Sequence, residues 1–148
     1  GESDTLPKEV HQRLSMSLDL LGTAYAKIGE LDAANEVLRL GVQWAGESGQ
    51  AATLFLALGR ASVASEKHGE SIGLLRRAIR LGADEREALP LLARSLAARD
   101  QILAAMVCAE RALELGADAE DVEPLREALQ AQLGDAWPRF QAMMTGTE

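Results

Sequence analysis

The sequence predicts an all-α protein in which antiparallel helix pairs stack as a solenoid. Apolar residues recur at spacings of three and four along most of the chain, which is the period of an amphipathic helix. The tetrapeptide Leu-Gly-Ala-Asp occurs at residues 81–84 and again at residues 115–118, an offset of 34 residues that is typical of helical repeats. Of the 148 residues 47% are apolar but only 3% are aromatic, so close helix packing is favoured over a β-sandwich.

The first helix is predicted to begin at Pro7 and to run to about Ile28. Proline is favoured in the first turn of a helix, and Thr5 or Asp4 can cap the amino end. Gly29 marks the turn to a second helix, which completes the first pair.

Turn residues separate the later helices. The two helices of the second pair are separated at residues 67–69, and the second pair is separated from the third at residues 82–84. Asp84 can cap the following helix, where Glu87 completes a capping box.

A further helix is predicted near the carboxyl end. Asp121 and Pro124 are expected to start it, and it ends near Gly134 and Pro138. Its leucines repeat every four residues. Because a solenoid needs a terminal helix to cover its last apolar face, this helix is expected to be the cap.

The helix pairs resemble the tetratricopeptide repeat, a 34-residue helix-turn-helix unit with small residues where its helices cross. The first copy matches best, with Leu18, Leu21, Gly22 and Tyr25 on its first helix. All crossing positions hold glycine, alanine or serine, namely Gly22, Gly59 and Ala93; Ala34, Ser71 and Ala105; and Gly41, Ala78 and Ala112. The resemblance implies a tetratricopeptide-type solenoid of three repeats with a carboxyl-terminal capping helix.

The resemblance also implies boundaries within a single domain of residues 1–148. The amino-terminal helix extension, the three repeats, the capping helix and the tail are expected at residues 5–14, 15–48, 52–85, 86–119, 120–136 and 137–148. Two features depart from the family. Gly22 and Gly59 are 37 residues apart, which indicates an insertion around residues 44–50, and the proline usual at the end of the second helix is absent. The first joint is therefore expected to bend differently.

Charge and composition exclude several classes of function. The net charge of −8 disfavours binding to nucleic acid, and the basic run Arg76, Arg77 and Arg80 is expected on a solvated face. No stretch approaches the roughly 20 apolar residues that cross a bilayer, and no signal peptide is evident. The single cysteine, Cys108, fits a reducing compartment, so we expect a soluble, cytoplasmic protein. The chain begins at Gly1 without methionine, which is compatible with a truncated amino terminus.

Motifs that suggest chemistry lack the required context. Residues 69–73 match the G-x-S-x-G elbow of serine hydrolases, but no strand is predicted before Ser71. His11, His68 and Cys108 lack the short spacings of a zinc site, and no glycine-rich phosphate loop occurs. We therefore expect no enzyme, no metal and no cofactor, with a hydrolase that uses Ser71 as the alternative.

In tetratricopeptide proteins the first helix of each repeat lines a concave groove that holds a peptide or helix. The resemblance therefore implies a protein-interaction scaffold. The groove residues that it implies are Asp19, Leu20, Thr23 and Lys27 in the first repeat, Leu56, Arg60 and Val63 in the second, and Leu91 and Arg94 in the third. Packing of the three leucines against neighbouring repeats is the competing interpretation.

The groove residues indicate the chemistry of a partner. Family members that clamp a carboxyl-terminal peptide use lysine and asparagine, whereas this chain has Asp19, Thr23, Ala57, Glu87 and Leu91 at those positions. This argues against a heat-shock cochaperone. Leucine and valine beside two arginines suit a partner with apolar anchors and acidic groups. Homo-oligomerisation is also left open.

A second interpretation is a small chaperone for translocator subunits of bacterial type III secretion. Those chaperones are similar in layout, with three such repeats, an extra leading helix and a short capping helix in an acidic chain. A chaperone is expected to hold an apolar partner that is insoluble alone, whereas a scaffold is expected to bind an independently stable one.

Overall fold

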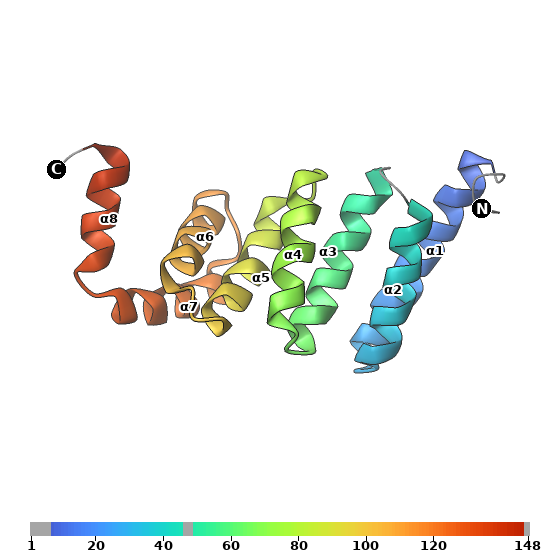
Figure 1. Ribbon diagram of the computed structural model, residues 1–148, viewed down its shortest axis with the longest axis horizontal. Helices are drawn as coiled ribbons and strands as arrows, with labels where there is room; N and C mark the ends of the chain where they lie inside the picture. The colour runs from blue at the N-terminus through green and yellow to red at the C-terminus, as the bar shows by residue number, and fades with distance from the viewer. Residues whose placement is uncertain (1–6, 46–48, 147–148) are drawn as a thin grey trace.

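The computed structural model describes residues 7–45 and 49–146 and contains eight helices in those ranges, with no strand (Figure 1). The helices are α1 Lys8–Lys27, α2 Leu31–Ala45, α3 Gly49–Ala64, α4 His68–Arg80, α5 Glu85–Ala98, α6 Ile102–Glu114, α7 Ala119–Leu133 and α8 Ala136–Thr145. The predicted all-α class is therefore confirmed.

Consecutive helices pack against each other and form an elongated stack. The pairs α1–α2, α3–α4 and α5–α6 have the largest contacts, and each pair then packs on the next. Figure 1 shows α1 and α2 at one end of the long axis and α8 at the other, so the first and last helices lie far apart. This arrangement is compatible with a helical repeat.

The 34-residue offset is visible in the backbone. The side chains of Asp84 and Asp118 accept hydrogen bonds from the backbone nitrogens of Arg86 and Glu120, at 2.9 and 3.0 Å. The two caps have almost the same conformation, with φ and ψ of −63° and 116° for Asp84 and −60° and 115° for Asp118. The turn before each cap passes through a glycine with positive φ, 101° at Gly82 and 92° at Gly116. The repeat therefore extends into the first turn of α7.

All nine small residues at the expected crossing positions are buried. All three glycines among them are required by neighbouring side chains, and two of these side chains belong to the second helix of the same pair. A Cβ atom at Gly22 would lie 2.5 Å from Leu38 Cδ2, and one at Gly59 would lie 2.6 Å from Leu75 Cδ2. Leu38 and Leu75 are themselves fully buried. At these two crossings a leucine on the second helix therefore fills the space that the glycine on the first helix leaves.

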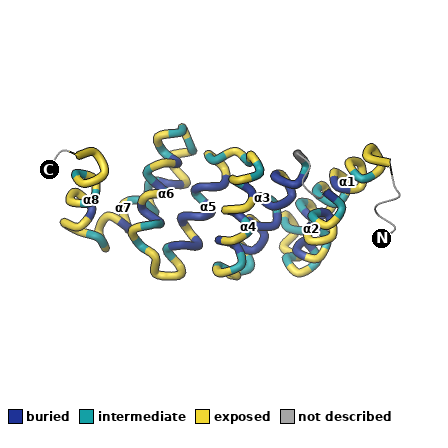
Figure 2. The backbone as a smooth tube through the Cα atoms, turned by 45° about the horizontal axis from the view of Figure 1, so that its top comes forward, coloured by how far each residue is buried: buried dark blue, intermediate teal, exposed yellow. Residues whose placement is uncertain are grey.

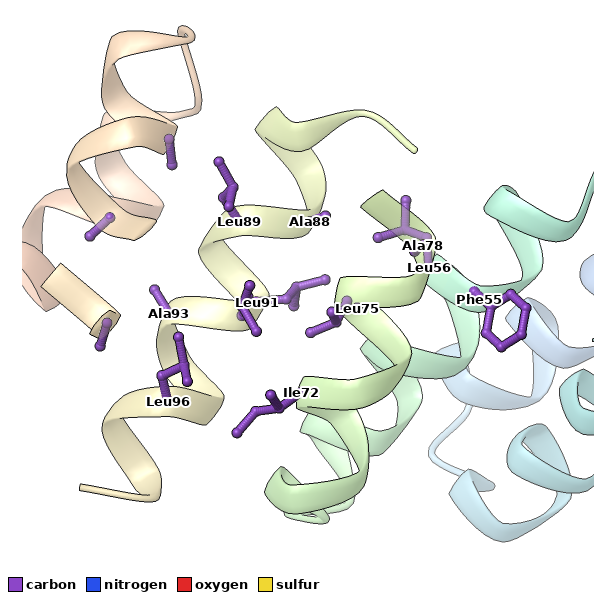
Figure 3. Close-up of a cluster of buried hydrophobic side chains, with 14 of the residues drawn as sticks. Phe55, Leu56, Ile72, Leu75, Ala78, Ala88, Leu89, Leu91, Ala93 and Leu96 are labelled. Carbon is purple, nitrogen blue, oxygen red and sulfur yellow. The ribbon is translucent and has the colours of Figure 1, made fainter. Parts of the chain in front are cut away.

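The hydrophobic core is continuous from α2 to α8 and is densest in the middle of the stack. Figure 2 shows α3 and α5 largely buried, whereas α1 and α8 are mostly exposed or half-buried. Between α3, α4 and α5 the core consists mainly of leucine, isoleucine and alanine, with Phe55 at its edge, as Figure 3 shows. Aliphatic and small side chains thus provide the close packing that the composition predicts.

Helix α1, Lys8–Lys27, agrees with the first helix predicted from Pro7 to about Ile28, and it includes the described part of the expected extension. Two boundaries differ from the sequence-based expectation. Helix α7 begins at Ala119 because Asp118, rather than Asp121, caps it. Part of the expected tail forms α8, in which Pro138 lies in the first turn, where a missing N–H costs no intrahelical bond. Burial of Trp137 holds α8 against the core.

Candidate functional site

The first helices of the pairs form one continuous face of the stack. Helix α1 packs against α3, α3 against α5 and α5 against α7, whereas α2, α4 and α6 make no comparable contacts with one another in the described chain. Helices that approach each other on one side of a stack make that side the shorter one. We call the face formed by α1, α3, α5 and α7 the inner face.

A cavity of about 510 Å³ opens between α3, α5 and α7 on the inner face. Glu87, Leu91 and Arg94 follow the spacings of four and three that place side chains on one side of a helix. Arg60 reaches the cavity from α3, and Asp121 reaches it from α7. The complete lining is Arg60, Asp84, Arg86, Glu87, Pro90, Leu91, Arg94, Gly116, Ala117, Asp118, Asp121 and Val122.

Several charged groups in this lining already have partners. Arg60 Nη2 lies 3.7 Å from Glu87 Oε2, so the Glu87 side chain pairs across to α3 instead of closing the predicted capping box. Asp84 accepts hydrogen bonds from the Arg86 side chain at 3.0 and 3.3 Å in addition to its capping bond. These hydrogen bonds from Arg86 lower the pKa of the exposed Asp84 carboxyl below its ordinary value.

Two charges in the cavity remain available. Within the described parts of the chain, the Arg94 guanidinium group and the Asp121 carboxylate form neither a hydrogen bond nor an ion pair. Both are exposed, and the apolar residues of the cavity lining include Pro90, Leu91 and Val122. The cavity therefore offers one free cation, one free carboxylate and an apolar floor.

The structure separates the nine predicted groove residues into three groups. Arg60, Leu91 and Arg94 line the cavity together. Leu56 is buried in the core between α3, α4 and α5, as the competing interpretation predicted, and Leu91 is buried as well although its edge reaches the cavity (Figure 3). The remaining residues lie on α1 or α3 outside the cavity lining, namely Asp19, Leu20, Thr23, Lys27 and Val63.

Asp19 connects α1 to α3. Thr23 Oγ1 donates to Asp19 Oδ1 at 3.5 Å, and Gln50 Nε2 on α3 donates to Asp19 Oδ2 at the same distance. Burial raises the pKa of the Asp19 carboxyl above its ordinary value of 3.8, while the Thr23 hydrogen bond and the charge of Arg60 act in the opposite direction. With the Arg60–Glu87 pair, Asp19 extends a line of alternating charge across α1, α3 and α5.

Asp19 and Asp84 are expected to affect stability with opposite signs. The folded-state pKa of Asp19 is raised, so its charge destabilises the fold at pH 7, and this penalty disappears as the pH falls through the folded-state pKa. Asp19→Asn should therefore raise the melting temperature at pH 7 but not in acid. The pKa of Asp84 is lowered, so its stabilising contribution is present above the unfolded-state pKa and is lost as the pH falls through the folded-state pKa.

The matched variant Asp84→Asn should consequently lower the melting temperature at pH 7, and the loss should vanish in acid. Melts followed by circular dichroism over a pH series test both expectations. A stabilisation by Asp19→Asn that does not change with pH would contradict the account of Asp19.

Asp121 was absent from the predicted groove, and Glu87 was named there only as a position without a clamp residue, although the sequence relates the two. They are 34 residues apart and occupy the same position in consecutive repeat units. Pro90 and Pro124 share this relation, since each is the sixth residue of its helix. Extending the repeat register into α7 would have identified Asp121 as a residue of the inner face.

Ser71, the residue of the hydrolase alternative, is fully buried. Its hydroxyl donates to the backbone carbonyl of His68 at 2.9 Å and lies 2.5 Å from Ser95 Oγ. The ring of His68 faces Ser95 instead, with its Nδ1 at 3.3 Å from Ser95 Oγ. A hydroxyl enclosed in this way cannot reach a substrate, so the G-x-S-x-G match corresponds to a helix crossing.

Other sequence features have no cluster around them. Cys108 is half-buried on α6, and burial raises the pKa of its thiol. Within residues 7–45 and 49–146 no three histidine, cysteine, aspartate or glutamate side chains come together as a metal site. None of the helices in those ranges is long and apolar enough to cross a membrane.

Comparison with known proteins gives no assignment. No family model matches the chain, and no curated protein matches it.

Proposed function

We propose that this chain is a tetratricopeptide-type interaction module that holds a segment of a partner protein on its inner face. The observation that carries the proposal is the cavity between α3, α5 and α7, whose lining combines apolar residues with a free arginine and a free aspartate. The 34-residue recurrence of the helix caps and the nine buried small residues support the repeat type.

The cavity favours a partner segment with an apolar side chain between two polar ones. Arg94 can bind a carboxylate through two parallel hydrogen bonds, because its guanidinium group is planar and has no partner in the described chain. Asp121 can bind a basic group of the partner, and an aliphatic side chain can cover Pro90 and Leu91. Arg60 contributes less, since Glu87 already neutralises it.

Charge reversal at Arg94 tests the proposal. Peptides selected from a phage-displayed library against the native chain serve as the probe, and fluorescence anisotropy measures their affinity. Arg94→Glu is expected to weaken binding by about tenfold or more, because attraction for the peptide carboxylate becomes repulsion. Since Arg94 is exposed, the variant should melt at the native temperature.

Arg80→Glu is the matched control, because Arg80 is an exposed arginine on α4, outside the inner face. It should bind the selected peptides with native affinity. Selected peptides that bind Arg94→Glu as tightly as the native chain would rule out the cavity as the binding site.

The secretion-chaperone interpretation stays the second candidate. In the described residues α1 is one continuous helix and is itself the first member of a pair. No described feature favours this alternative over a general interaction module.

A further inference from the structure

One side of α1 carries an apolar stripe that is exposed along its whole length. Its large side chains are Val10, Leu14, Leu21 and Ile28, and they are exposed although each is aliphatic. They follow helical spacings of four and seven, with small residues between them. The α1 stripe consists of Val10, Leu14, Ser17, Leu21, Ala24 and Ile28.

The same side is an internal interface in the next pair. The positions of α3 that correspond to Ser17 and Leu21, 37 residues later, are Leu54 and Leu58. Leu54 packs against Gly41 of α2, since a Cβ atom added to Gly41 would lie 2.8 Å from Leu54 Cδ2. Leu58 is 2% exposed, whereas Leu21 is 46% exposed. The α1 stripe thus has the character of a surface on which another helix packs.

We propose that this surface joins two copies of the chain, with α1 of one copy packed antiparallel against α1 of the second. A two-fold axis near residue 19 brings Leu14 opposite Ala24 of the second copy, and Leu21 opposite Ser17 of the second copy. Large side chains then meet small ones in the middle of the stripe, and two large side chains, Val10 and Ile28, meet at each end. Such self-complementarity is the requirement for a symmetric dimer.

Charge complementarity fixes the direction of the pairing. Glu9 and Lys27 are exposed on the same flank of the stripe, near its opposite ends. Antiparallel packing places Glu9 of each copy beside Lys27 of the other, whereas parallel packing would place these residues on opposite sides of the interface, without contact.

At the opposite end of the stack, α7 exposes Glu120, Glu127 and Gln130, whereas α8 exposes Met143 and Met144. The polar side chains of α7 are unsuited to cover an apolar surface. A second α1 is the occupant that the self-complementary stripe and its flanking charges favour. The dimer leaves the cavity between α3, α5 and α7 uncovered, so it is independent of the proposed peptide binding.

Sedimentation equilibrium of the 148-residue chain tests the dimer. The native chain is expected to be dimeric at micromolar concentration, and Leu21→Glu is expected to be monomeric with an unchanged far-ultraviolet circular dichroism spectrum. Leu40→Glu on α2 is the matched control, because Leu40 is 44% exposed but lies outside the stripe, and it should remain dimeric. A monomeric native chain, or a dimeric Leu21→Glu variant, would overturn the proposal.

The charged flank provides a second test that does not depend on the core. Glu9→Lys and Lys27→Glu should each raise the dissociation constant of the dimer by about threefold to tenfold, because both symmetric contacts become repulsive. The double variant should restore native affinity, since the negative and positive charges only exchange places. Parallel packing would show neither the loss nor the rescue, so unchanged affinity in both single variants would exclude the antiparallel arrangement.

Discussion

Replacing Gly59 with alanine is expected to lower the free energy of unfolding by about 1–3 kcal/mol. The added Cβ would lie 2.6 Å from Leu75 Cδ2 and 2.8 Å from Leu75 Cγ, and Leu75 is fully buried and has little room to move. Gly73→Ala in α4 is the control, because a Cβ there meets nothing within 4 Å. In a helix interior that change should stabilise the protein by about 0.5–1 kcal/mol. Urea denaturation of both variants measures whether each change lowers or raises the free energy of unfolding.

A double-mutant cycle tests whether Gly59 and Leu75 pack against each other. Leu75→Ala alone should cost about 2–5 kcal/mol, because it opens a cavity in the core. In the presence of Gly59→Ala the new methyl group occupies part of that cavity, so the two losses should not add. In the third repeat, Ala93 and Ala109 occupy the positions that correspond to Gly59 and Leu75, and both alanines are buried. Strict additivity of the two changes would show that Gly59 and Leu75 do not pack against each other.

Trp137→Ala is expected to release α8 from the rest of the structure. Trp137 is only 6% exposed and belongs to the core, and its ring stacks on Phe140 with centroids 5.7 Å apart. Truncation of a buried tryptophan costs about 3–5 kcal/mol, and an isolated helix of ten residues is marginal in water. Hydrogen exchange should therefore show loss of amide protection in α8, while α3 to α6 stay protected.

Met143→Ala is the control for this loss, because Met143 lies on the same helix and is largely exposed. It should leave the protection of α8 unchanged. Native protection of α8 in Trp137→Ala would mean that other contacts hold the helix in place.

The helix pairs and their register could be predicted because both depend on short-range chemistry. Turn glycines with positive φ, such as Gly82 and Gly116, and the capping aspartates Asp84 and Asp118 specify backbone conformations that recur wherever the same residues recur. Small residues at helix crossings carry a similarly direct signal, since a crossing excludes larger side chains. Helix α8 lacked such a signal, because burial of Trp137 depends on contacts with residues distant in sequence.

The candidate site could be predicted only in part. The positions of Arg60 and Arg94 on the inner face follow from the helical register. Their different roles do not, because the Arg60–Glu87 pair depends on how far α3 and α5 lie apart. Burial of Leu56 depends likewise on the approach of α4 and α5, which the spacing of apolar residues along one helix does not specify.

The inner-face contacts have a consequence for cooperativity. The contacts that build the stack join helices one or two places apart, so each helix depends on its neighbours for stability. We therefore expect the ends of the stack to open before the middle. Asp121 and Val122, which line the cavity, belong to α7 near the carboxyl end. A ligand that contacts both α5 and α7 would therefore stabilise this end of the stack, and its binding would slow the opening of the last two helices.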